Sequence, residues 1–202
     1  MATFVLRVWI PDRPGALGAV ASRIGSVKAD VIGIDIIERG AGRAIDDLVI
    51  ELPDAELVDL LLAEIAQVEG VDVEDIRELD GPLLDPAIHA LQVAGAMQHC
   101  SSSVEALSML VQGAEGLIGA DWAAVLDCDA AAVVASVGED VPSEKWLGAF
   151  VAGVTAEGAR GDHDELAVTS LPHSNLKLIV SRSRLPLRSR ERSVLEALCG
   201  LL

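Results

Sequence analysis

The first eighty residues alternate between apolar runs typical of strands and apolar positions spaced as in a helix. Residues 4–10 form a β-branched, apolar run that predicts a buried strand, and Pro11 to Gly15 end it. A helix is predicted next, because apolar residues then recur at helical spacing: Leu17, Val20, Ala21, Ile24 and Val27.

Three further elements complete this half. Residues 31–39 and 44–52 read as a hairpin joined by the glycine-containing residues 40–42. Pro53-Asp54 opens a second helix that Gly70 ends, with one apolar stripe: Leu57, Leu61, Ile65 and Val68. Residues 71–79 alternate imperfectly, as in an edge strand or a strand with a bulge. The predicted order is βαββαβ.

Proline breaks divide the chain. Gly81-Pro82 and Asp85-Pro86 interrupt regular structure twice within six positions, and the sequence changes character after them. We therefore expect a first domain at residues 1–80, a linker at 81–86 and a second domain at 87–202.

The second domain is also predicted to be α+β. A helical stretch starts at Ala87, and Ser102 with Glu105 forms a capping-box pattern before another amphipathic helix. A further helix starts near Ser143, and a closing one at Ser189. The expected strands form two antiparallel hairpins: residues 122–127 with 131–137, and 165–171 with 176–183.

Composition favours a soluble globular protein. Hydrophobic residues make up 51% of the 202 positions, yet no charge-free run approaches the length of a membrane span. The start of the chain lacks the basic segment and cleavage site of a secretory signal, so we expect a cytoplasmic protein without membrane partners.

The charge argues against nucleic acid as a partner. The formal net charge of -17 would repel a phosphate backbone, and with aromatic residues at 2% there are few rings to stack on bases. Five of the 15 basic residues cluster near the C-terminus: Arg182, Arg184, Arg188, Arg190 and Arg192. We favour pairing with the protein's own carboxylates over a phosphate socket.

Catalytic and metal signatures are not found in the sequence. There is no Walker loop, no GxGxxG after a strand, no GxSxG elbow and no HExxH helix. Adjacent His99 and Cys100 seldom converge as base and nucleophile, and the other histidines, at 89, 163 and 173, are dispersed. The scattered Cys100, Cys128 and Cys199 read as buried thiols. We expect no enzyme, cofactor or metal site.

The residues Asp12-Arg13-Pro14-Gly15-Ala16-Leu17 after a strand, within a βαββαβ order, resemble an ACT domain over roughly residues 3–79. The resemblance implies a ferredoxin-like fold and a regulatory module that commonly senses amino acids. It also implies a dimer, in which the first strand-to-helix loop of one subunit meets the sheet or helix of another.

Transferred position by position, the resemblance implies a ligand site formed by the first loop and the start of the second strand. Amides freed at a helix start can receive a carboxylate, which independently suits an amino acid. Asp12 would bind its ammonium group or would simply cap the helix, and Gly15 would serve a tight turn, backbone access or both. The implied site residues are Asp12, Arg13, Pro14, Gly15, Ala16, Leu17, Val31, Ile32, Gly33 and Ile34.

The Gly15-Ala16-Leu17 sequence is similar to the Gly-Ala-Leu motif of phenylalanine-sensing ACT domains. Their Glu-Ser-Arg motif is matched only by Glu38-Arg39, without the serine. The identity of the amino acid stays open.

Residues 87–202 resemble a degenerate GAF domain through their helix, antiparallel strands and leucine-rich closing helix, and we assign them no ligand.

The leading hypothesis is a non-catalytic, amino-acid-responsive regulatory protein that acts through assembly or a partner. The alternative is an interaction subunit of a metabolic enzyme or transporter with no ligand of its own, and a small enzyme with an unrecognised site is a third reading.

Overall fold

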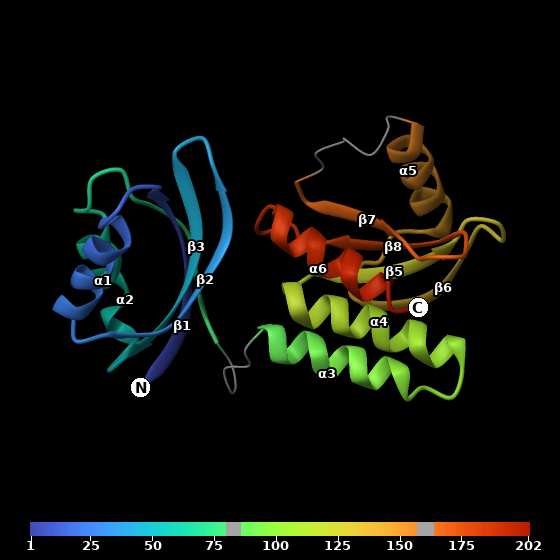
Figure 1. The fold of residues 1–202 in the computed structure, drawn as a ribbon, viewed down its shortest axis with the longest axis horizontal. Coiled ribbons are helices and arrows are strands. Elements are labelled where there is room, and N and C mark those ends of the chain that lie inside the picture. Colours follow the sequence, from blue (N-terminus) through green and yellow to red (C-terminus); the bar gives the residue numbers. More distant parts are fainter. Residues whose placement is uncertain (80–85, 157–163) are drawn as a thin grey trace. The chain divides into compact units, whose positions relative to one another are not determined.

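A computed structural model describes residues 1–79, 86–156 and 164–202, and the chain divides into two units, Met1–Leu83 and Leu84–Leu202 (Figure 1). The predicted linker at residues 81–86 lies, except for Pro86, outside the described residues, as does His163. The domain boundary therefore stays a prediction.

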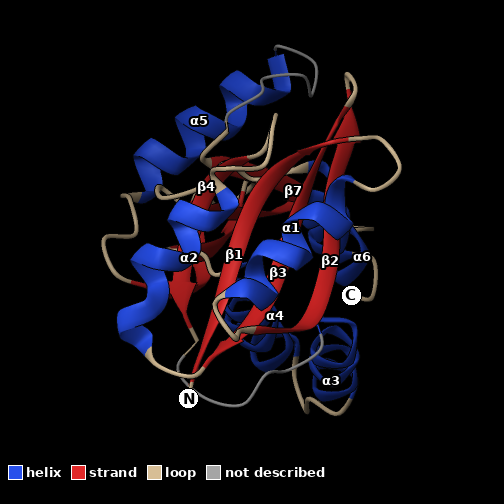
Figure 2. Cartoon of the chain, turned by 90° about the vertical axis from the view of Figure 1, so that its left-hand side faces the viewer, coloured by secondary structure: helices blue, strands red, loops and turns tan. Residues whose placement is uncertain are grey.

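The first unit is one antiparallel sheet with helices on one face. Figure 2 shows both helices in front of the sheet, and the strand order is β2-β3-β1-β4. The βαββαβ prediction is confirmed. The elements are β1 (Ala2–Pro11), α1 (Ala16–Ser26), β2 (Asp30–Gly40), β3 (Arg43–Leu52), a 3-10 turn (Ala55–Leu57), α2 (Val58–Ile65) and β4 (Asp72–Glu78).

The core of this unit lies between the sheet and its two helices. Alternate residues of β1 point toward the helices, since side chains of a strand alternate between its faces. Phe4, Leu6, Val8 and Ile10 are all buried there. The same alternation places Leu48 and Ile50 of β3 beside them, and Val20 and Ile24 of α1 above.

Both edge strands carry bulges. The register of β2 against β3 shifts at Ile32 and again at Ile37, and β4 shifts against β1 at Glu74. The prediction that residues 71–79 form an edge strand or a bulged one is confirmed in both respects, because an edge strand accommodates an extra residue without disturbing a second neighbour.

The helix predicted from Pro53 to Gly70 is wrong in extent. Asp54 caps the 3-10 turn by accepting a hydrogen bond from the Glu56 amide, and α2 itself ends at Ile65. The Val68 amide donates to the Ile65 carbonyl, so the chain tightens into turns there. Gly70, at a φ of 77°, lies in the turn before β4.

The second unit is also a four-stranded antiparallel sheet, in the order β6-β5-β8-β7. Helices α4 and α6 pack on one face and α5 on the other, while α3 packs on α4. Both predicted hairpins are confirmed. The elements are α3 (Pro86–Gln98), α4 (Ser103–Ile118), β5 (Trp122–Asp127), β6 (Ala132–Gly138), α5 (Glu144–Ala156), β7 (Leu166–Ser170), β8 (Leu176–Ser181) and α6 (Ser189–Cys199).

The cap of α4 differs from the predicted capping box in one bond. Ser102 is the N-cap and its hydroxyl accepts from the Glu105 amide at 3.2 Å. The Glu105 carboxylate, however, accepts from the Ser101 amide at 2.7 Å rather than from that of Ser102.

A buried ion pair joins the residue after β8 to α6. Arg182 donates to both carboxylate oxygens of Glu191, at 2.7 and 2.8 Å, and both side chains are buried. Arg182 also donates to three carbonyls, those of Ile118, Leu185 and Pro186. Arg192 donates to the carbonyls of Leu187 and Leu166. For Arg182, the predicted pairing with the protein's own carboxylates is confirmed.

We predict that Glu191→Ala lowers the free energy of unfolding by about 3–5 kcal/mol, because it leaves the Arg182 guanidinium buried without its counter-ion. Glu196→Ala is the control on the exposed side of the same helix. It should change the free energy of unfolding by no more than about 0.5 kcal/mol. Urea unfolding of both variants measures the difference, and equal stabilities would contradict the role given to the pair.

Candidate functional site

The loop between β1 and α1 turns sharply at Gly15. This residue is the N-cap of α1 with a φ of 87°, a conformation that glycine adopts without strain. The Asp12 amide donates to the Gly42 carbonyl at 2.9 Å, which ties the loop to the turn between β2 and β3. The positive φ of this tight turn is thus sufficient to explain a glycine at position 15.

The start of α1 presents amides without acceptors. The Ala16 amide donates to the Arg13 carbonyl at 3.3 Å, and the first helical bond runs from Ala19 to Gly15. Among the described residues nothing accepts from the amides of Leu17 and Gly18, and no side chain caps the helix. Such a helix start can bind an anion such as a carboxylate.

The interpretation of Asp12 as the helix cap is wrong. Gly15 holds the N-cap position, three residues further along, and Asp12 instead accepts a hydrogen bond from Arg39 of β2 at 2.6 Å. Both side chains are exposed, so this ion pair adds little stability and can be opened by a ligand. Arg39, which the sequence analysis noted only as part of a motif comparison, therefore contacts the loop from β2.

The predicted residues of the second strand lie at the other end of β2 from Arg39. Val31 packs against the core, and the Cα of Gly33 faces Val49, whose Cγ2 would lie 3.2 Å from an added Cβ. Ile32 and Ile34 are exposed. Within one chain, residues 12–17 and 31–34 are not brought together.

Asp46 is a candidate that the sequence analysis missed. It lies in the middle of β3, directly opposite Val8 of β1 and Ile36 of β2, so its side chain shares the helix side of the sheet. Only 3% of the residue is exposed, and its Oδ1 atom is buried without a hydrogen-bond partner. A buried, unpartnered carboxylate oxygen is costly to keep.

The ionisable groups around Asp46 connect it to the loop. Burial raises the pKa of the Asp46 carboxyl, Arg39 lowers it in part, and Asp12, Asp47 and Asp35 raise it further. The Asp46 carboxyl therefore interacts electrostatically with both members of the exposed ion pair, Asp12 and Arg39.

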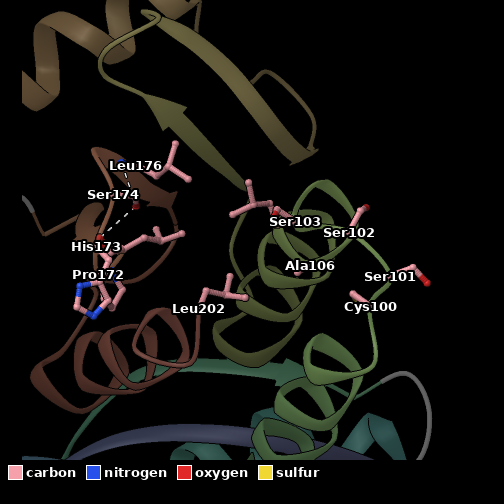
Figure 3. Close-up of a pocket in the computed structure, with 12 residues that line it drawn as sticks. Cys100, Ser101, Ser102, Ser103, Ala106, Pro172, His173, Ser174, Leu176 and Leu202 are labelled. Atoms are coloured by element: carbon pink, nitrogen blue, oxygen red, sulfur yellow. Dashed lines mark hydrogen bonds between the residues drawn. The ribbon is translucent and has the colours of Figure 1, made fainter.

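A second candidate lies in the other unit, where a pocket of about 540 Å³ separates the start of α4 from the turn between β7 and β8 (Figure 3). Cys100 and the hydroxyls of Ser101 to Ser103 line one side, and Pro172 and His173 line the other. The lining residues are apolar or neutral polar, apart from the histidine, so they provide no fixed charge to bind an ionic ligand.

The cysteines do not fit a nucleophile. Desolvation, helped by Glu105, raises the pKa of the Cys100 thiol, and burial raises that of Cys199 to about 12. Thiols with raised pKa values stay protonated and react slowly. His99 and Cys100 each bond to a carbonyl of α3 instead of to one another. Of the three predicted buried thiols only Cys199 is fully buried, whereas Cys100 and Cys128 are half-buried.

We predict that the difference in unfolding free energy between Asp46→Asn and the wild type grows as pH rises. A carboxyl whose pKa is raised by folding binds its proton more tightly in the folded state, so the wild type loses stability as pH rises from the unfolded value through the folded one. Asparagine does not titrate. Urea unfolding between about pH 4 and 8 measures the difference, and a constant difference would contradict a raised pKa.

Comparison with known proteins gives a family for part of the chain. Residues 4–70 match the family model described as ACT domain. A search of the curated proteins found no match. The resemblance of residues 87–202 to GAF domains is not confirmed by these comparisons and stays a prediction. No helix in the described ranges is both long and apolar enough to cross a membrane.

Three solved structures are similar to parts or most of this chain at low sequence identity. The ACT domain from the GTP pyrophosphokinase of Chlorobium tepidum is 16% identical and covers 39% of this chain and 100% of its own, with a TM-score of 0.32. A formyltetrahydrofolate deformylase from Pseudomonas putida KT2440 is 17% identical. The match covers 48% of this chain and 38% of the deformylase, also with a TM-score of 0.32. An unknown protein from Galdieria sulphuraria is 14% identical. The match covers 99% of this chain and 91% of that protein, with a TM-score of 0.36.

The matched residues 4–70 hold β1, α1, the hairpin of β2 and β3, and α2, while β4, which completes the βαββαβ fold, follows directly at Asp72–Glu78. Residues 4–70, within the N-terminal unit of this chain, are thus an ACT domain, and ACT domains as a family are regulatory modules that commonly bind amino acids.

Proposed function

We propose that this chain is a non-catalytic regulatory protein that binds an amino acid at the start of α1 and signals through assembly or a partner. The observation that carries the proposal is the pair of unbonded amides, Leu17 and Gly18, which suits a ligand carboxylate. The Arg39 guanidinium beside the loop adds a positive charge for the same group.

The oligomer is the second part of the proposal. Strand β2 is an edge of its sheet, and it exposes Ile32, Ile34 and Ile36, the most exposed being Ile34 at 53%. An exposed apolar edge strand favours pairing with another chain. We therefore propose a homodimer through the ACT domain.

The same row of isoleucines supports an alternative function. If association alone is retained, the chain is an interaction subunit of a metabolic enzyme or transporter, without a ligand of its own. The two functions differ in one measurable property, because only the first requires that an amino acid stabilise the folded protein.

We predict that at least one common amino acid raises the melting temperature of the full chain. A ligand at about a hundred times its dissociation constant adds roughly 2.7 kcal/mol to the stability of the folded state, which corresponds to several degrees. A thermal-shift screen of the twenty amino acids measures this. If none of them shifts the melting temperature, the sensing function is wrong and the interaction function takes its place.

The position of the site is tested with the amino acid found in that screen. Gly18→Asp places a negative charge beside the free amides and should weaken binding by about tenfold or more, whereas the neutral isostere Gly18→Asn should not. Gly18 suits this test better than Gly15, because its added Cβ meets nothing within 4 Å and its φ is ordinary, whereas Gly15 has a positive φ. Equal binding by both variants would place the ligand elsewhere.

We also predict a particle of twice the 21.1 kDa chain mass in light scattering at micromolar concentration. Ile34→Lys should shift it toward monomer, because it puts a charge on the exposed edge. The matched control is Leu60→Lys on α2, where leucine is also exposed. A monomeric wild type, or equal effects of both variants, would reject dimerisation through β2.

A further inference from the structure

We infer that the pocket between the start of α4 and the β7–β8 turn binds a neutral small molecule with an apolar body and one hydrogen-bonding group, such as an amide or an alcohol. The inference does not rest on the proposed function, because the pocket and the start of α1 belong to different units of the chain. It gives a ligand class to the unit for which the sequence analysis predicts no ligand.

The first step is the size and lining of the cavity. Its volume of about 540 Å³ lies within the range of about 300–1,000 Å³ that small-molecule pockets occupy in proteins. Such pockets combine apolar walls, which hold the body of the ligand, with a few polar groups that orient it. The apolar lining residues include Ala106, Leu107, Leu171, Pro172 and Leu176. The serines and the histidine of the lining supply the polar groups.

The second step is the lack of charged side chains around the cavity. None of the twelve described residues that line it is Asp, Glu, Lys or Arg, although these four types make up 23% of the chain. Nine of the twelve come from residues 86–104 and 166–176, two stretches without any of these types that the fold brings together. A charged ligand would lose hydration there without gaining a counter-ion, and the net charge of -17 also repels anions. The pocket therefore favours a neutral ligand.

The third step is the way in which the two walls are held. On the α4 side, the Ser102 hydroxyl accepts from the Glu105 amide at 3.2 Å, and the Glu105 carboxylate accepts from the Ser101 amide at 2.7 Å. On the other side, the side-chain amide of Asn175 donates to Asp129 at 2.7 Å, which ties the β7–β8 turn to the turn after β5. Both walls are thus fixed without a ligand, so binding does not have to order them.

The fourth step is the polar groups that these bonds leave available. The Ser103 hydroxyl and the His173 ring both line the pocket, and neither forms a hydrogen bond with another residue that the structure describes. Figure 3 shows Ser103 at the start of α4 and His173 across the pocket on the β7–β8 turn. A hydroxyl both donates and accepts, and a neutral imidazole offers one donor and one acceptor. These groups suit an amide or an alcohol, which also donates and accepts.

The test uses three probes that share one hydrocarbon ring and differ in charge: cyclohexanecarboxamide, cyclohexanecarboxylate and cyclohexylmethylamine. Each is titrated at neutral pH into the full chain labelled with ¹⁵N, and binding is followed by NMR. The neutral amide should bind with a dissociation constant of about 1–10 mM, as expected for so small a compound, and should shift the backbone signals of the lining residues. The carboxylate and the protonated amine should bind at least about tenfold more weakly.

The decisive variant is Ser103→Trp, which fills the cavity from an exposed position and should weaken the amide at least about tenfold. The matched control is Val104→Trp, which adds the same side chain one position further along α4. Val104 is 66% exposed and does not line the pocket, so this variant should bind like the wild type. Ser174→Trp blocks the cavity from the exposed β7–β8 turn and tests the same point independently. Thermal melts show that each variant is folded.

Each contrary outcome overturns a definite part of the inference. If Ser103→Trp and Val104→Trp bind the amide equally well, or the shifted signals lie away from the pocket, the ligand binds elsewhere. If the carboxylate or the amine binds as tightly as the amide, the neutral class is wrong. If none of the probes binds the wild type at about 20 mM, the pocket is not a site for this class of molecule. The thermal-shift screen of amino acids remains a separate measurement, so failure here leaves the proposed function standing.

Discussion

The pairing of β1 with β3 sets the geometry of the N-terminal domain. Ten consecutive residue pairs join these two central strands without a register shift, from Ala2 with Leu52 to Pro11 with Arg43. This register decides which side chains meet the helices, and a slip of one residue would send the whole apolar set to the other face. It also fixes Asp46 among apolar neighbours, so one carboxylate lies within the apolar core of this unit.

Much of this architecture can be predicted from the sequence, because the apolar periodicity and the glycine and proline positions that end each element agree. The strand predicted at residues 122–127 has those bounds in the structure, and the other predicted strands differ by at most two residues at an end. The predicted helix after Pro53 is too long, because apolar residues continue at helical spacing beyond Ile65, where the chain has already tightened into turns. Periodicity alone does not distinguish these two conformations.

The candidate site was harder to predict, since its parts come together only in the folded sheet. Asp12 and Arg39 are 27 positions apart, and nothing local shows that they pair. Asp46 did leave a signal: in the alternating set Ala44, Asp46, Leu48, Ile50, it is the polar member of a buried face. Asp46 lies outside the first loop, and Asp12 in that loop is the carboxylate nearest in sequence to the helix start. The free amides of α1 follow from Gly15 at the N-cap, a residue without a side chain to cap them.

The bulges of β2 limit what its exposed edge can do. Each extra residue, at Ile32 and Ile37, bends the strand and breaks the even spacing of its backbone groups. A long, flat edge would accept strand after strand, but one interrupted twice within a few residues offers a short stretch to a single neighbour. If two copies meet there, the contact is self-complementary and uses the same patch on both, so the assembly closes at two chains and does not propagate into a fibre.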